Sequence, residues 1–306
     1  MDHTTMEGSN SAAASYRNDM LKLFAMFTML IDHIGYIFFP QYRIFRTIGR
    51  LAFPIFAYQV ATGYTKTSNL KNYARRLFHF ALLSQIPYSF FSPDLKFDPL
   101  HLNIMFLLLF SLGIIYVYDM GMAQFHDYQE KKDYRHMFTG TALLLGVCGM
   151  AILPEILEIA YPKFRFSYGM YGLLLVLFFY ICRDKKIPMV LCYVLLSLFY
   201  TYFTGAKTLA INSVSWLGTS ESLWSCLASF DIVWGNITTY KNGLIQLEGY
   251  FFQTRSILSL VPIYFLEQYE TKIKLNKYIG YLFYPTHISI IIIIAIFERL
   301  PVSSIH

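Results

Sequence analysis

Charged side chains are scarce in this chain of 306 residues, because Asp, Glu, Lys and Arg together make up only 14% of it. A soluble domain usually holds about 25% of such residues. Hydrophobic residues reach 56% and aromatic residues 18%. This balance argues against a soluble protein and predicts a chain that crosses a membrane several times.

Cysteine is also rare, and its spacing is not that of a metal or redox site. None of the four cysteines forms a CxxC pair, and three of the four lie inside apolar runs. Their positions are Cys148, Cys182, Cys192 and Cys226. This pattern argues against a disulfide framework and against a zinc site, so we expect no metal.

The sequence lacks the alternation of a transmembrane barrel, whose strands are ~10-residue segments of period two. Its apolar runs are continuous and ~17 to 23 residues long, which suits helices. We therefore predict an all-α fold, a polytopic bundle of transmembrane helices with about nine spans. The expected spans lie near residues 20–39, 46–64, 76–92, 102–118, 138–160, 167–182, 188–204, 250–266 and 279–298.

The first 19 residues lack the basic start of a signal peptide. We expect residues 1–19 to be a disordered polar segment, and residues 20–306 to form a single transmembrane domain. The loop "YTKTSNLKNYARR" carries four basic residues and no acid, which predicts that it and the N-terminus are cytoplasmic. Such loops account for the net charge of +6, so we expect membrane lipids around the chain and no nucleic acid.

Residues from about 206 to 250 break the pattern, since they are more polar and contain all three tryptophans. Leu223, Leu227, Phe230 and Trp234 recur at helical spacing. This stripe predicts either an amphipathic helix lying in the membrane interface or a mobile outer loop with one short helix. We describe the segment as a Trp-rich interfacial insertion in the domain.

Asp32 and His33 lie side by side in the first span, within "MLIDHIGYIFFP". A mid-membrane aspartate costs about 2.5 to 3.5 kcal/mol, so such residues persist where they find partners or serve a function. Adjacent helical residues point about 100° apart, so each needs a partner from another segment. His287 lies roughly 13 Å along the last span. Histidine exchanges protons near neutral pH, which makes His33 and His287 candidates for catalysis.

Arg46 and Arg50 open the second span and lie four residues apart on one helix face. Like charges at this spacing repel, and lipid headgroups or a specific anion at the outer face would offset the repulsion. Arg50 lies deeper, which makes it a candidate both for an ion pair with Asp32 and for contact with a substrate. Pro54 is expected to bend this helix.

Arg75 and Arg76 open the third span at its cytoplasmic end. They either grip phosphates or anchor the helix as ordinary positive-inside residues. Four further polar residues are candidates for substrate contacts, with structural hydrogen bonds or surface solvation as the alternative: Gln85, His101, Asn103 and Glu155.

Five segments of the chain resemble the TraX family of membrane proteins. They are "LKLFAMFTMLIDHIGYIFFP", "RTIGRLAFPIFAYQVATGY", "NYARRLFHFALLSQIPY", "SYGMYGLLLVLFFYICRD" and "YIGYLFYPTHISII", in that order. The resemblance covers most of residues 20–200 and then 253–292, and the insertion at 206–250 departs from it. It carries the family motif onto Asp32, His33, Arg50, Pro54 and His287.

The resemblance implies an enzyme, because the namesake of this family is associated with N-terminal acetylation of a conjugative pilin subunit. The family is also similar to the wider multi-span membrane acyltransferases. We therefore expect an acyl-CoA-dependent acetyltransferase of the bacterial cytoplasmic membrane, with acetyl-CoA as donor and an unknown pilin-like peptide, glycan or lipid as acceptor. Four arginines are the candidates for binding the charged donor: Arg46, Arg50, Arg75 and Arg76.

The residues leave the mechanism open. Either His33 or His287 could take the proton from the acceptor as the general base. His287 could instead donate a hydrogen bond to the oxyanion that develops on the thioester carbonyl. Transfer through an acetyl-histidine intermediate is a further possibility. Asp32 would orient Arg50 or His287. Buried Asp, His and Arg also suit a proton-coupled transporter, although the sequence shows no inverted repeat. A non-catalytic scaffold that binds a partner through its insertion is the third reading.

Overall fold

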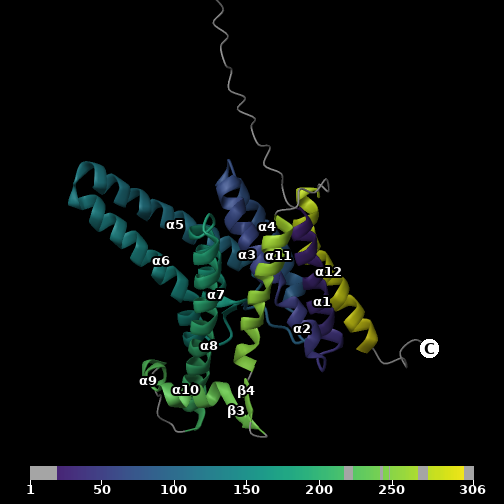
Figure 1. The fold of residues 1–306 in the computed structure, drawn as a ribbon. Coiled ribbons are helices and arrows are strands. Elements are labelled where there is room, and N and C mark those ends of the chain that lie inside the picture. Colours follow the sequence, from purple (N-terminus) through teal and green to yellow (C-terminus); the bar gives the residue numbers. More distant parts are fainter. Residues whose placement is uncertain (1–18, 217–222, 242–243, 248, 268–274, 300–306) are drawn as a thin grey trace, which may run out of the picture.

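The computed structural model describes residues 19–216, 223–241, 244–247, 249–267 and 275–299 (Figure 1). The predicted disorder of residues 1–19 falls outside these ranges, apart from Asp19. The long helices are α1 (Asp19–Phe38), α3 (Ala52–Lys66), α4 (Leu70–Tyr88), α5 (Ile104–Lys131), α6 (Tyr134–Ala160), α7 (Gly169–Ile181), α8 (Lys186–Trp216) and α12 (Lys277–Arg299).

Shorter elements connect these helices. The short helices are α2 (Arg43–Gly49), α9 (Leu223–Ala228), α10 (Phe230–Ile237), the 3-10 helix η1 (Gly249–Ser259) and α11 (Leu260–Glu267). The strands are β1 (His101–Leu102), β2 (Arg165–Phe166), β3 (Thr238–Lys241) and β4 (Leu244–Leu247). β1 pairs with β2 in parallel, and β3 pairs with β4 as an antiparallel hairpin. The fold is therefore a helical bundle with two small two-stranded sheets in its described part.

The long helices lie side by side in one bundle, and the α5–α6 hairpin angles away from it (Figure 1). α12 contacts α1 and α4, while α7 contacts α3, α5, α6 and α8. Nearly every residue of α7 is buried, which is typical of a helix that is apolar on all sides. Gly172 of α7 lies against Leu107 and Phe53, where an added Cβ would come within 3.0 Å of each. The core therefore sits where α3, α5 and α7 meet.

Five described helices are long and apolar enough to cross a membrane: α1, α5, α6, α12 and residues 186–210 of α8. α7 is apolar but shorter. These helices bear out the predicted helical membrane bundle, and they do not confirm the count of nine spans.

The predicted second span is two helices rather than one bent helix. α2 closes with Arg50 N–H donating to Arg46 O and Leu51 N–H donating to Ile48 O, after which α3 begins at Ala52. Pro54 is the third residue of α3, where a backbone N–H would have no carbonyl acceptor within the helix. The proline therefore fits the start of α3, and the break comes before it.

The span expected at 250–266 has nearly the predicted bounds, but it is the 3-10 helix η1 followed by the short α11. Pro262 is the third residue of α11, where a helix needs no backbone N–H donor. The insertion expected from about residue 206 overlaps the end of α8, which continues to Trp216. Leu209 and Ala210 of α8 pack against the cluster formed by Ala206, Cys226 and Val233, so this part of α8 contacts the insertion.

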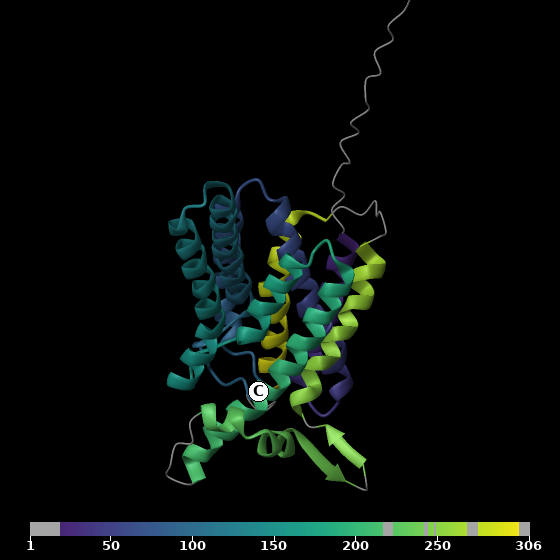
Figure 2. The same cartoon turned by 60° about the vertical axis from the view of Figure 1, so that its left-hand side comes forward.

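The insertion lies across one end of the bundle, with α9, α10 and the β3–β4 hairpin in one layer (Figure 2). The single amphipathic helix predicted here is two helices, broken at Ser229, whose hydroxyl donates to Ser225 O. Cys226 and Val233 are buried against Ala206 of α8, whereas Phe230 and Trp234 of the predicted stripe are exposed. Its position in a membrane interface stays a prediction.

Candidate active site

A cavity of about 530 Å³ lies between α1, α3, α4 and α12. Lys22, Tyr73 and Gly280 line it near the first turns of α1, α4 and α12. Asp98 and Arg165 line it near the other ends of these helices, beside strands β1 and β2. The lining therefore extends from the predicted cytoplasmic end of the bundle toward the outer end, where the insertion lies.

The two histidines singled out in the sequence meet at this cavity. His33 Nδ1 lies 2.7 Å from His287 Nε2, and their rings stack at 4.9 Å with an angle of 12°. Both side chains are buried, and Phe91 packs 4.6 Å from the His33 ring. The first and last described helices thus bring two imidazoles into direct contact within the bundle.

The hydrogen bonds assign a tautomer to each neutral ring. His287 Nδ1 lies 2.6 Å from Phe283 O, and a carbonyl oxygen only accepts, so His287 Nδ1 carries the proton. His287 Nε2 is then the acceptor for His33 Nδ1–H. The remaining nitrogen, His33 Nε2, therefore carries no proton and can accept a hydrogen bond. Of these two rings only His33 lines the cavity, so His33 is the histidine placed to accept a proton from a molecule bound there.

Asp32 binds a different arginine from the one that the sequence favoured. Arg46 Nη1 donates to Asp32 Oδ2 at 2.7 Å, whereas Arg50 Nη1 donates to Gln253 Oε1 at 3.0 Å. The cause is the close approach of α2 to α1, because a Cβ added at Gly49 would overlap Asp32. The expected orientation of His287 by Asp32 is also wrong, since His287 binds His33 and the backbone.

Gln253 is a site residue that the sequence analysis missed. It lies on η1, is 9% exposed and lines the cavity beside Arg50. The resemblance that resumes at residue 253 was the one signal in the sequence that pointed to it.

Of the four predicted substrate contacts, only His101 lines the cavity. Gln85 accepts from Asn103 N and Nδ2 and donates to His101 O, which ties α4 to β1. Asn103 also caps α5 by accepting from Met105 N. Burial, and next the charge of Arg165, lowers the pKa of His101 below its usual value near 6.5.

Glu155 is buried at 2% exposure rather than solvated at the surface. Its carboxylate accepts from Lys207 Nζ at 2.6 Å and from Met170 N at 3.1 Å. Lys207 also donates to Glu158 at 3.0 Å. These bonds join α6, α7 and α8, and none of the three ion-pair residues lines the cavity.

Arg75 and Arg76 lie near the cavity but do not line it. Arg75 donates to Asn72 Oδ1 at 2.9 Å, and the Arg76 guanidinium lies 5.8 Å from the ring centre of Tyr73. Tyr73 and Lys22 line the cavity at this end. Lys22 is a second cavity residue that the sequence analysis passed over.

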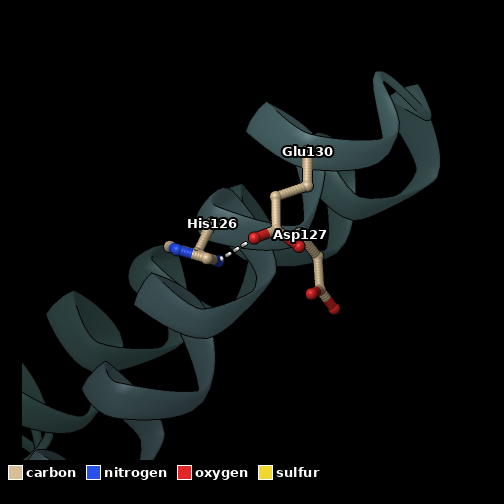
Figure 3. A group of neighbouring side chains, drawn as sticks. All are labelled: His126, Asp127 and Glu130. Carbon is tan, nitrogen blue, oxygen red and sulfur yellow. Dashed lines mark ion pairs between the residues drawn. The ribbon is translucent and has the colours of Figure 1, made fainter.

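One group of metal-capable side chains occurs in the described residues (Figure 3), and none of its members lines the cavity. His126, Asp127 and Glu130 lie on the last turns of α5, and their ligand atoms lie within 4.8 Å of one another. His126 and Glu130 are 70% and 62% exposed and form an ordinary i, i+4 pair at 3.6 Å. The expectation of no metal stays a prediction.

Apolar helices around a buried, ionisable cavity define a polytopic membrane protein with an internal polar site. The chain belongs to the TraX family, because the model of the TraX protein matches residues 17–233. It is also 48% identical over 40 residues to "Uncharacterized protein RP591" from Rickettsia prowazekii (strain Madrid E). That match spans 13% of this chain and 16% of the relative. No solved structure matches the chain.

Proposed function

We propose that this chain is an acetyltransferase of the bacterial cytoplasmic membrane that uses acetyl-CoA as donor. The observation that carries the proposal is the His33–His287 pair, whose hydrogen bonds leave His33 Nε2 as an acceptor on a cavity-lining ring. A neutral imidazole held in one tautomer is the form in which histidine acts as a general base. Membership of the TraX family supports the same assignment.

In the proposed reaction, His33 Nε2 takes the proton from an acceptor hydroxyl or amine. The oxygen or nitrogen attacks the thioester carbonyl, and the tetrahedral intermediate collapses with loss of the CoA thiolate. His33 returns the proton to that thiolate, so protons balance over one turnover. His287 Nε2 accepts from His33 Nδ1 throughout, which favours the imidazolium that forms transiently.

The donor would reach His33 from the predicted cytoplasmic end. Lys22 lines the cavity there, and the side chain of Lys22 lies across Gly280. Arg75 and Arg76 follow Tyr73 on the first turns of α4, beside the same opening. Three cationic side chains around this end would attract the phosphates of CoA.

The test is donor turnover by the purified full chain in lipid nanodiscs. Release of the CoA thiol from acetyl-CoA is measured with isolated cell envelopes as the acceptor source. His33→Ala should lower kcat by about 10²- to 10⁴-fold, because that is the usual contribution of a general base.

His79→Ala is the matched control, since His79 is an exposed histidine of α4 outside the cavity lining. It should turn over at the wild-type rate. A folded His33→Ala variant that also keeps the wild-type rate would rule out His33 as the base.

The second candidate is a proton-coupled transporter, because a cavity that extends toward both ends and a histidine relay also suit proton movement. Proton flux in liposomes discriminates the two functions. Flux that requires His33 in a protein that does not turn over acetyl-CoA would favour transport.

A further inference from the structure

The bond between Arg50 and Gln253 fixes which way the Gln253 amide faces. A guanidinium only donates, so the atom that accepts from Arg50 Nη1 at 3.0 Å must be the amide oxygen, Oε1. The amide nitrogen therefore points to the other side. Gln253 Nε2 is buried and has no hydrogen-bond partner in the described structure.

A buried donor without a partner is unfavourable. Leaving such a group unsatisfied typically costs about 1 to 3 kcal/mol, and native structures seldom retain one without a reason. Gln253 lines a cavity large enough to admit a ligand group, so the amide sits where a ligand would relieve this cost. The unpaired Gln253 Nε2 therefore marks a position where a bound ligand would supply the missing hydrogen-bond acceptor.

The charge of the lining indicates what that ligand group is. Around the outer half of the cavity, four cationic side chains face two carboxylates: Arg46, Arg50, Lys96 and Arg165 against Asp32 and Asp98. Arg46 pairs with Asp32 and Arg165 with Asp98. A cavity with this balance attracts anions.

We propose that the Gln253 amide oxygen occupies the position on Arg50 that an oxyanion of a ligand takes when it binds. This oxyanion is a carboxylate or phosphate of the acceptor. When the acceptor binds, its oxygen replaces Oε1 on the guanidinium. The freed amide turns so that Nε2–H donates to the same oxyanion. The exchange replaces a neutral bond with a charge-assisted one and gives the orphaned donor a partner.

This proposal rests on the proposed function in one respect, because it assigns the anion to the acceptor of that reaction. Binding is measured without acetyl-CoA, so failure of catalysis and failure of this site are separate results. The probes are D-glucuronate and glycerol 3-phosphate, with D-glucose and glycerol as neutral analogues. Dissociation constants come from saturation-transfer NMR on the full chain in phosphatidylcholine nanodiscs.

Gln253→Glu is the decisive variant. Its carboxylate keeps the size of the side chain, binds Arg50 more tightly and competes with an incoming oxyanion, so the acidic probes should bind at least about tenfold more weakly. The free variant should melt no lower than the wild type, since its orphaned donor is gone. Gln124→Glu places the same extra charge on α5, outside the cavity lining, and should change these constants by less than about threefold.

A second variant keeps the test independent of how Gln253→Glu folds. Arg50→Gln should lose the preference for acidic over neutral probes. The proposal is overturned if the wild type binds acidic and neutral probes alike, if Gln253→Glu binds within twofold of the wild type, or if Arg50→Gln keeps the preference. Nanodiscs with phosphatidylglycerol then identify the source, because displacement of the soluble probe by this lipid assigns the oxyanion to a headgroup, and no displacement assigns it to a soluble acid.

Discussion

His33 and His287 are separated by 254 positions in the chain, yet His33 Nδ1 and His287 Nε2 lie 2.7 Å apart. The backbone oxygen of Phe283 sets the direction of the whole relay, because it can only accept from His287 Nδ1. The hydrogen bond within α12 therefore determines that His33 of α1 presents Nε2 to the cavity.

Removal of His287 should weaken catalysis without weakening donor binding. His287→Ala deletes the acceptor that holds His33 in its tautomer, and the loss of such a supporting bond typically costs about 10- to 100-fold. We expect the loss in kcat for acetyl-CoA turnover, with KM for acetyl-CoA unchanged. His287→Gln should recover part of it, because its amide oxygen can accept from His33 Nδ1. Equal rates in the two variants would contradict a positioning role.

A side chain at Gly49 should destabilise the protein. An added Cβ would overlap Asp32, so Gly49→Val forces α2 away from α1 and breaks the Asp32–Arg46 pair. Overpacking of this kind costs typically about 1 to 3 kcal/mol. The melting temperature in detergent should fall, whereas Gly146→Val, where nothing lies within 4 Å, serves as the control and should melt near the wild type.

The ion pair that joins α6 to α8 should behave as a buried pair. Lys207→Met leaves Glu155 as an uncompensated charge at 2% exposure. Removing one partner of a buried ion pair typically lowers the free energy of unfolding by about 3 to 5 kcal/mol. The double variant with Glu155→Gln should recover most of the melting temperature. Failure of the second substitution to restore stability would show that the bond from Lys207 to Glu158 carries the stabilisation.

The acid sensitivity of the protein should decrease when His101 is replaced. Because the folded state lowers the pKa of His101, the unfolded state binds more protons below pH 6.5, and stability falls as the pH drops through this range. His101→Gln removes that contribution. The melting temperature of the variant should therefore depend less on pH between 6.5 and 5 than that of the wild type. Parallel curves would show that His101 does not titrate on unfolding.

The sequence identified the ionisable residues of the site better than the contacts between them. It marked Asp32, His33 and His287, because ionisable groups stand out against an apolar helix, and it required partners from other segments. It offered Arg50 and His287 as partners of Asp32, whereas the hydrogen bond in the structure comes from Arg46. The choice depends on the close approach of α2 to α1 at Gly49, which hydrophobicity does not report.

Composition and the length of the apolar runs determined that the chain is a helical membrane protein. A bilayer admits only helices and closed barrels, and continuous apolar runs of this length suit helices. Sequence similarity determined its family. Only the tertiary structure decided that His33 faces the cavity while His287 lies behind it, and that Gln253 holds Arg50 from an insertion-side helix. These relationships join residues some 200 positions apart or more, and hydropathy and spacing record only what lies nearby along the chain.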